Sequence, residues 1–305
     1  MEHESRRTGT RKKGGGLLTP LLAVLLFLTG AGIFLYPSVS NYFAGREQIS
    51  VIREYREQLD TTEEAELAAE WEKAETYNES LAGDPVQDPF VPGSGYALPE
   101  NYEEVLNVNG VMGYVEIPKI GVLLPIYHGT TDEVLEKGVG HIESTALPIG
   151  GEYRHAVLTG HRGLPSAELF TRLDEMKTGD IFLIHVLGKT LAYEVDQIKT
   201  VLPTELDDLQ AIPGEDLVTL LTCTPYGVNT HRLLVRGSRT EYVQETEDTE
   251  TVTEQSPGFR FELSIAGVVI GVVLLAILMV LFGNRKHGRY ERRGKRKKRR
   301  GQHER

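Results

Sequence analysis

Two long stretches without a charged side chain, residues 17–36 and 263–283, constrain the fold of this chain more than any other feature. At about 1.5 Å per residue, each would form a helix roughly 30 Å long, which matches the hydrocarbon core of a bilayer. The first stretch is longer than the apolar part of a cleavable signal peptide, about 7–15 residues, so we interpret it as an uncleaved anchor. The sequence therefore predicts two transmembrane helices.

Charge is strongly segregated around these two spans. Residues 1–16 carry five Lys or Arg side chains and residues 284–305 carry twelve, whereas 40 acidic and 16 basic side chains lie between the spans. Because basic flanks stay in the cytoplasm, we expect a two-pass protein of the cell membrane with both termini cytoplasmic and residues 37–262 outside. The basic tail is typical of a segment that fixes topology and contacts anionic membrane lipids, and we expect no nucleic-acid partner.

The segment between the spans divides into four parts by composition. Residues 37–81 are expected to be helical and amphipathic, because apolar side chains recur there at helical spacing, namely Ile52, Tyr55, Leu59, Leu67, Trp71, Ala74 and Leu81. Residues 82–99 hold four prolines and three glycines, which predicts a loop, and its length favours a functional role. Residues 100–242 are β-rich, and residues 243–262 form an acidic linker.

Short apolar runs separated by turn residues fill the β-rich part. Strands are expected at 113–120, 122–127, 181–187, 190–201, 216–223 and 230–237, with Pro118 and Pro125 at edges or bulges. Gly188-Lys189 is typical of a two-residue hairpin turn, and a change of alternation near Asp196-Gln197 predicts a bulge. Short helices are expected at 131–137 and 165–176. The pattern predicts a mainly β fold, a closed or nearly closed β-barrel with short peripheral helices.

The sequence contains one cysteine, Cys223, which excludes an intramolecular disulfide framework and a multi-cysteine zinc site. A thiol kept outside the cell without a partner favours chemistry over structure. Cys223 ends one expected strand, and an antiparallel return would bring Arg232 beside it, with opposed Cβ atoms about 5 Å apart.

A thiol with an ordinary pKa of about 8.5 needs a basic or cationic neighbour to become a thiolate. His161 is the best candidate, because it lies between Gly160 and Arg162-Gly163 at the end of a strand-like run. The remaining histidines of the outer segment offer less: His128, His141, His155, His185 and His231.

The residues around these three side chains resemble a sortase. Residues 219–223 read TLLTC, of the form TLxTC, Arg232 follows nine residues later, and the Thr-Gly-His of 159–161 lies upstream. The longer stretches TGHRGLP, HVLGKTLAYEVDQI and TLLTCTPYGVNTHRLLVRG are similar to class C, pilus-assembling sortases. This resemblance covers roughly residues 45–240. The two spans and the tripeptide Asp88-Pro89-Phe90 are also similar to class C.

The resemblance implies a sortase-like closed β-barrel and a cysteine transpeptidase of a Gram-positive type of cell membrane. Cys223 would attack the Thr–Gly carbonyl of an LPxTG-like sorting signal and form a thioacyl enzyme, while His161 would protonate the leaving amine. Arg232 would hold the substrate or stabilise the oxyanion. Asp88 and Phe90 would belong to a lid, the loop 82–99, over the active site.

The resemblance also implies partners. The substrates would be pilins or surface proteins with an LPxTG-like C-terminal signal, and a pilin lysine would accept the acyl group, so that pili polymerise. The main alternative is a sortase that attaches surface proteins to the amine of cell-wall peptidoglycan, and another is a catalytically silent membrane scaffold. We expect no cofactor and no metal, since no HExxH motif is present. Arg162 and Arg236 are assigned to surface ion pairs.

Overall fold

The computed structural model describes residues 18–81, 101–241 and 271. From Tyr36 onward, the described residues up to 241 belong to one compact unit, which contains all the strands. The second expected span, the basic tail and the expected lid with Asp88 and Phe90 lie outside the described residues, apart from Gly271.

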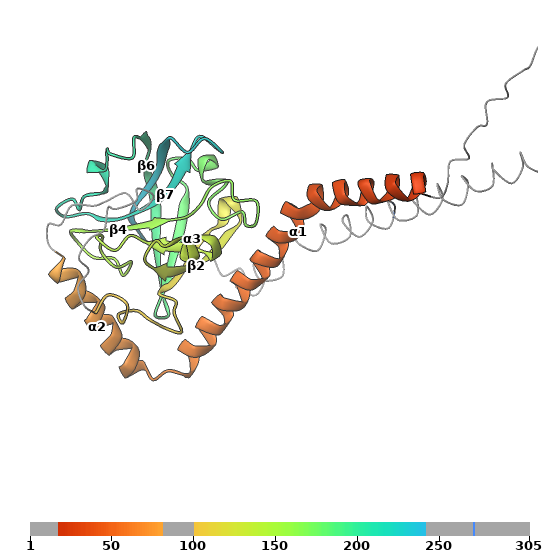
Figure 1. The fold of residues 1–305 in the computed structure, drawn as a ribbon. Coiled ribbons are helices and arrows are strands. Elements are labelled where there is room, and N and C mark those ends of the chain that lie inside the picture. The colour runs from red at the N-terminus through yellow and green to blue at the C-terminus, as the bar shows by residue number, and fades with distance from the viewer. Residues whose placement is uncertain (1–17, 82–100, 242–270, 272–305) are drawn as a thin grey trace, which may run out of the picture. The chain divides into compact units, whose positions relative to one another are not determined.

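Eight strands form a closed barrel within the described residues (Figure 1). Their order around the barrel is β1-β2-β3-β4-β7-β8-β6-β5. Their bounds are β1 Gly113–Ile117, β2 Val122–His128, β3 Val139–His141, β4 Arg154–Thr159, β5 Ile181–Val186, β6 Lys189–Val201, β7 Asp216–Thr224 and β8 His231–Thr240. Pairing is antiparallel except for β2 with β3 and β4 with β7. The predicted closed β-barrel is therefore confirmed, and closure leaves no free sheet edge within it.

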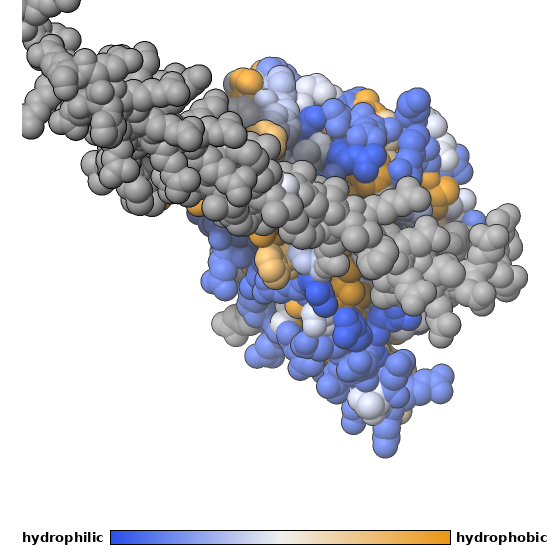
Figure 2. All heavy atoms as spheres, turned by 90° about the vertical axis from the view of Figure 1, so that its right-hand side faces the viewer, coloured by the Kyte–Doolittle hydropathy of each residue, from blue (hydrophilic) through white to orange (hydrophobic). Residues whose placement is uncertain are grey.

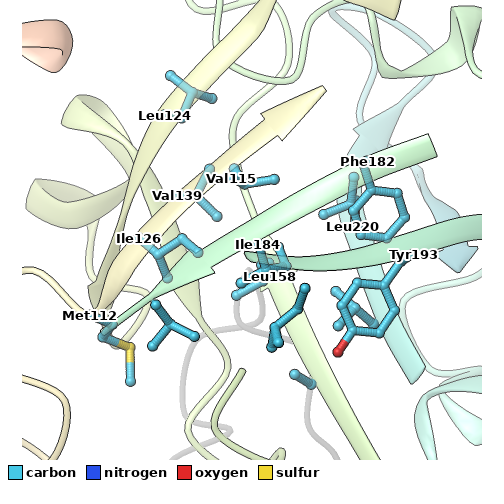
Figure 3. Close-up of a cluster of buried hydrophobic side chains, with 14 of the residues drawn as sticks. Met112, Val115, Leu124, Ile126, Val139, Leu158, Phe182, Ile184, Tyr193 and Leu220 are labelled. Carbon is cyan, nitrogen blue, oxygen red and sulfur yellow. The ribbon is translucent and has the colours of Figure 1, made fainter. Parts of the chain in front are cut away.

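The barrel interior is filled by side chains that alternate along the strands. Figure 3 shows part of this core, with side chains from the strands β1 to β7 and from Met112, which precedes β1: Met112, Val115, Leu124, Ile126, Val139, Leu158, Phe182, Ile184, Tyr193 and Leu220. Each fully buried apolar side chain stabilises the fold by about 1.5–3 kcal/mol. The face shown in Figure 2 is largely hydrophilic where described residues are visible, with scattered hydrophobic side chains.

The β5–β6 hairpin differs from its prediction by one residue. Val186 pairs with Lys189, so the turn consists of Leu187 and Gly188, both with positive φ (44° and 76°). This is the conformation of a type I′ turn, which suits the twist of the strands although Leu187 is an uncommon residue there. The predicted bulge is confirmed, because the β6–β8 register shifts between Val195 and Gln197.

The two prolines lie close to the ends of pairing. Pro118 ends β1 by starting a short 3₁₀ helix, η1 Pro118–Ile120. Pro125 lies within β2, immediately before Ile126, where the pairing with β3 begins. Because proline has no N–H to donate, it is favoured near the end of a strand or of its pairing, although Pro125 still pairs with Tyr114 of β1.

One of the two expected peripheral helices forms, and the other does not. The helix α3 Asp132–Lys137 forms, with the Thr131 hydroxyl accepting a hydrogen bond from the N–H of Val134. The helix expected at 165–176 is wrong: this segment contains the 3₁₀ helix η2 Leu173–Glu175, and turns precede it. Its backbone bonds are instead those of successive turns, such as Thr171 N–H to Glu168 O at 2.8 Å, and the N–H of Phe170 donates outside the segment to the carbonyl of His161 at 3.1 Å. A third 3₁₀ helix, η3 Asp207–Leu209, follows β6.

Two helices occupy the amphipathic segment: α1 Leu18–Thr61 and α2 Glu64–Ser80. Within the described residues one helix is long and apolar enough to cross a membrane, the part of α1 from Val24 to Thr61. Farther along, the predicted apolar stripe packs on the barrel: Ile52, Tyr55 and Leu59 of α1 and Ala74 of α2 are buried, whereas Trp71 is only partly buried and lies under the ammonium of Lys189 at 3.5 Å.

The Tyr55 hydroxyl fastens α1 to the barrel. It accepts a hydrogen bond from the N–H of Leu187 at 3.0 Å and donates to the carbonyl of Met112 at 3.2 Å, and burial raises the pKa of Tyr55 to about 12. Tyr55→Phe should lower the free energy of unfolding by about 1–3 kcal/mol, because both backbone groups lose a buried partner. Urea unfolding of the detergent-solubilised chain, followed by Trp71 fluorescence, measures this. The matched control is Tyr153→Phe on an exposed ring; equal stability of the two variants would contradict this role.

Candidate active site

Cys223 lies near the end of β7, directly opposite Arg232 of β8 in the antiparallel register. Both side chains are buried, with 7% and 4% of each residue exposed. The predicted neighbours are therefore brought together by strand pairing itself, because directly opposed residues have Cβ atoms about 5 Å apart. The connection that allows this is the short loop between Thr224 and His231.

The two side chains lie on the outer face of the barrel. Leu220 and Val235 belong to the interior core, so the alternation of each strand directs their neighbours outward. Leu221 and Leu234 accordingly belong to a second apolar cluster, with Ile142, Val157, Val201 and Leu209. Cys223 and Arg232 each lie two residues from a member of this outer cluster, which supports one side of the site.

His161 lies two residues beyond the end of β4, which pairs in parallel with β7. The last paired residues are Thr159 and Leu221. His161 and Cys223 each lie two residues beyond that pair. The two segments stay in contact one residue past the end of β4. The N–H of Gly160 donates to Leu221 O at 3.2 Å, and the Thr222 hydroxyl donates to Gly160 O at 2.7 Å. His161 and Cys223 therefore lie at the same end of two adjacent strands.

Gly160 and Gly163 explain the sequence around His161. A Cβ atom at Gly160 would lie 3.0 Å from the buried ring of Phe170, and one at Gly163 would lie 3.0 Å from Tyr226. Gly163 also has a φ of +80°, which glycine adopts without strain. The close approach at Gly160 lets the loop after β4 fold back on itself, and that at Gly163 lets it pass against the loop after β7.

Burial and nearby carboxylates act in opposite directions on His161. Burial lowers its pKa below the ordinary value, because removal from water disfavours the imidazolium, while Asp132 and Glu136 of α3 oppose this shift. Neutral imidazole is thus favoured near neutral pH, and this form can take a proton from a thiol.

The guanidinium of Arg232 is oriented by the β7–β8 loop. Its Nη1 donates to Asn229 O at 3.3 Å and to His231 O at 3.2 Å. Both acceptors belong to the chain that leads into β8, so the loop and the strand hold one permanently charged donor beside the thiol.

Arg162 and Arg236, which the sequence assigned to surface ion pairs, differ in their relation to the site. Arg236 pairs with Asp196 at 2.6 Å, as expected for an arginine in an ion pair. Arg162 also forms the expected ion pair, with Asp174, whose side chain is 49% exposed, but the arginine side chain itself is only 9% exposed. Its Nη1 donates to the hydroxyl of Thr224, the residue after Cys223, at 3.1 Å. Its position directly after His161 was the one feature of the sequence that could have indicated this contact.

Other histidines are engaged in buried structural contacts. His155 Nδ1 donates to Gln210 O at 3.0 Å, so its Nε2 accepts from the Thr219 hydroxyl at 2.7 Å. His141 donates from Nε2 to Ala146 O at 2.8 Å and accepts at Nδ1 from Tyr102 at 2.9 Å. Burial lowers the pKa of each to about 4.

These two histidines predict an acid-sensitive fold. In the unfolded chain a histidine binds its proton near pH 6.5, but in the fold only near pH 4, so between these values the unfolded state holds more protons. The free energy of unfolding should therefore fall as the pH is lowered through this window. Urea unfolding at pH 7, 6 and 5 measures the slope, and His155→Gln should flatten it while His231→Gln should not. An unchanged slope in His155→Gln would contradict this explanation.

Comparison with known proteins identifies the family in which this arrangement is found. Residues 115–240 match the family model described as a sortase domain. The crystal structure of sortase C from Streptococcus pneumoniae is 48% identical in sequence and superimposes with a TM-score of 0.59, covering 63% of this chain and 97% of that one. This chain belongs to the sortase family. Sortase C-1 of Actinomyces oris is equally identical (48%), with a TM-score of 0.55 over 58% of this chain and 99% of that one.

Curated sortases are more distant. Sortase D of Bacillus subtilis is 35% identical over 134 residues, which cover 42% of this chain and 63% of that protein, less than two thirds of its length. Sortase A of Staphylococcus aureus is 25% identical over 72% of this chain and 92% of that protein. Sortases are cysteine transpeptidases, and class C sortases are the structural neighbours of this chain. The single cysteine of this sortase is Cys223.

Proposed function

We propose that this sortase cleaves an LPxTG-like sorting signal between Thr and Gly and transfers the acyl group to a lysine of a pilin. The observation that carries the chemistry is the direct opposition of Cys223 and Arg232 at the end of β7 and β8, with His161 at the matching end of β4. A buried thiol, an imidazole and a permanent cation on one barrel face are the groups that acyl transfer through sulfur requires.

In the first step, Cys223 Sγ attacks the threonine carbonyl carbon after its proton passes to His161. The tetrahedral oxyanion is stabilised by the guanidinium of Arg232, which requires no proton transfer because it is always charged. The C–N bond then breaks, and the glycine amine leaves with the proton from His161. In the second step a lysine amine attacks the thioester, an isopeptide bond forms, and the proton returns to the thiol.

The choice of a pilin lysine follows from the class C neighbours. The S. pneumoniae sortase C structure concerns pilin substrate specificity, and another neighbour, 47% identical, is sortase C1 of GBS Pilus Island 1. The alternative acceptor is the amine of cell-wall peptidoglycan, which would attach surface proteins singly. Incubation with pilins that carry an intact or a Lys-substituted acceptor site tests this: a ladder of linked pilins that disappears on lysine substitution supports the proposal. Transfer to peptidoglycan fragments alone would overturn it.

We infer further that the loop 82–99 acts as a lid through Asp88 and Phe90, as the class C resemblance implies. Asp88→Ala and Phe90→Ala should raise the rate of Cys223 alkylation by iodoacetamide several-fold, because a restraint on access is removed. The rate is measured by intact mass over time, with Tyr153→Phe as a matched surface control. Unchanged rates in both lid variants would show that this loop does not gate the thiol.

We propose a two-pass topology for the same enzyme. The charge pattern of residues 1–16 and 284–305 supports cytoplasmic termini, which leaves the barrel outside the cell, where surface proteins and pilins are found. The basic flanks would also contact anionic lipid headgroups.

A further inference from the structure

The segment that carries His161 is fastened to the segment that carries Cys223 on both sides of the reactive pair. Before the pair, residues 159 and 160 are held to residues 221 and 222 by backbone pairing and by the Thr222 hydroxyl. After the pair, backbone pairing of the two strands has ended. The contact that continues the connection comes from a side chain, Arg162, which reaches Thr224.

The guanidinium of Arg162 makes two directed contacts. Nη1 donates to Thr224 Oγ1 at 3.1 Å, and Nη2 pairs with Asp174 Oδ2 at 2.5 Å. Arginine can make both contacts at once because its donors form a rigid planar fork. Arg162, which directly follows His161, is therefore connected both to Thr224, which directly follows Cys223, and to Asp174 of η2.

The rest of the loop folds back on His161 and gives Asp174 a fixed place. The N–H of Phe170 donates to His161 O at 3.1 Å, and the N–H of Gly163 donates to Thr171 Oγ1 at 3.2 Å. Phe170 itself is fully buried. The carboxylate of Asp174 thus stands on a loop that is already anchored, so the ion pair restrains Arg162 against a rigid partner.

A gain in folding stability does not explain the two contacts of Arg162 well. The Nε of Arg162 is buried and has no hydrogen-bond partner in the described part of the chain. A buried donor without a partner costs about 1–3 kcal/mol. An arginine whose largely covered side chain carries this cost is better explained by the position it maintains than by the stability it adds.

We propose that Arg162 is a positioning residue that holds the imidazole of His161 in register with the thiol of Cys223, by bridging Thr224 and Asp174. It does not touch the substrate and acts through the relative placement of the two reacting groups. A displacement of about 1 Å between reacting groups can reduce turnover by about a hundredfold, so the loss of this bridge should affect kcat. The peptide-cleavage readout rests on the proposed function, whereas thiol alkylation does not.

The test uses the full chain in detergent and four variants. Arg162→Gln removes both contacts; Arg162→Lys keeps the charge but lacks the planar fork; Thr224→Val removes one hydrogen bond without a change in charge; and Arg162→Gln/Thr224→Val combines them. Each is measured for kcat and KM of sorting-peptide cleavage, for the pH profile of Cys223 alkylation by iodoacetamide, and for thermal unfolding. Arg236→Gln is the matched control, since it removes a two-contact arginine–aspartate pair of the same barrel, with Asp196.

Arg162→Gln should lower kcat by about ten- to a hundredfold with KM nearly unchanged, and should shift the alkylation profile. Arg162→Lys and Thr224→Val should change both readouts in the same direction. The double variant should be no worse than Arg162→Gln, because Arg162→Gln already removes the contact with Thr224 that Thr224→Val removes. Arg236→Gln should leave both readouts unchanged.

Restoration of kcat and of the profile by Arg162→Lys would overturn the proposal in favour of a charge effect. A Thr224→Val variant with wild-type kcat and profile would overturn it even if Arg162→Gln does not fold. If the wild-type chain cleaves no sorting peptide, the proposed function fails, yet the alkylation profiles of Thr224→Val and Arg162→Lys still decide the role of Arg162.

Discussion

Cys223→Ala should abolish cleavage of a sorting peptide, with a loss of about a thousandfold or more, because no other thiol in the chain can form the thioacyl bond. The substitution changes one buried side chain at the end of β7 and leaves the β7–β8 pairing intact, so the barrel should still fold. Chromatography of the cleaved peptide, with thermal unfolding of the variant, measures both expectations.

Cys223→Ser is the informative companion to this variant. It retains a side chain of similar size beside Arg232 and His161 but replaces sulfur by a hydroxyl, whose ordinary pKa is far above that of a thiol. Both variants should therefore be folded and inactive. Cleavage by Cys223→Ala at a rate near that of the wild type would remove the nucleophile from its assigned role.

His161→Gln is expected to produce the second large loss, about 10²- to 10⁴-fold in kcat, because an amide can form hydrogen bonds but cannot exchange a proton. Cys223 should still react with iodoacetamide, but the pH dependence of its alkylation rate should change, since its proton acceptor is gone. Measurements of kcat from pH 5 to 9 show whether the dependence on the imidazole disappears.

His231→Gln is the matched control for this substitution. His231 lies directly opposite Thr224, one residue from the reactive pair, but its side chain bonds locally to Thr230. The control should keep its activity within a few-fold of the wild type. Equal losses in the two histidine variants would mean that the region, rather than the imidazole of His161, governs the rate.

The sequence predicted the barrel because strand periodicity and turn residues are local properties. The bulge between Val195 and Gln197 was visible as a change of alternation, and the opposition of Cys223 and Arg232 followed from two strand patterns joined by a short loop. The placement of His161 is a tertiary result. It depends on the parallel pairing of β4 with β7, and no local pattern announces such a pairing between distant segments.

The errors have physical reasons as well. The hairpin turn was expected at Gly188-Lys189, but Leu187 takes a positive φ that sequence preference disfavours, and α1 supports it through the hydrogen bond from Leu187 to Tyr55. The helix expected at 165–176 is replaced by turns and η2, because the N–H of Phe170 donates to His161 O and Asp174 pairs with Arg162, and these contacts hold the loop in another path. The ion pair of Arg162 was expected, but its low exposure and its contact with Thr224 were not, because charge alone does not indicate burial.

The central claim is that Cys223 carries the acyl group during transfer, and the most direct test is the intact mass of the enzyme during turnover. Incubation of the full chain with a sorting peptide should add the mass of the peptide's N-terminal acyl fragment. Peptide mapping should locate the fragment on Cys223, and a lysine-bearing acceptor should remove it and appear with the same fragment attached. Product formation with no adduct on Cys223, or with the fragment on another residue, would contradict the account.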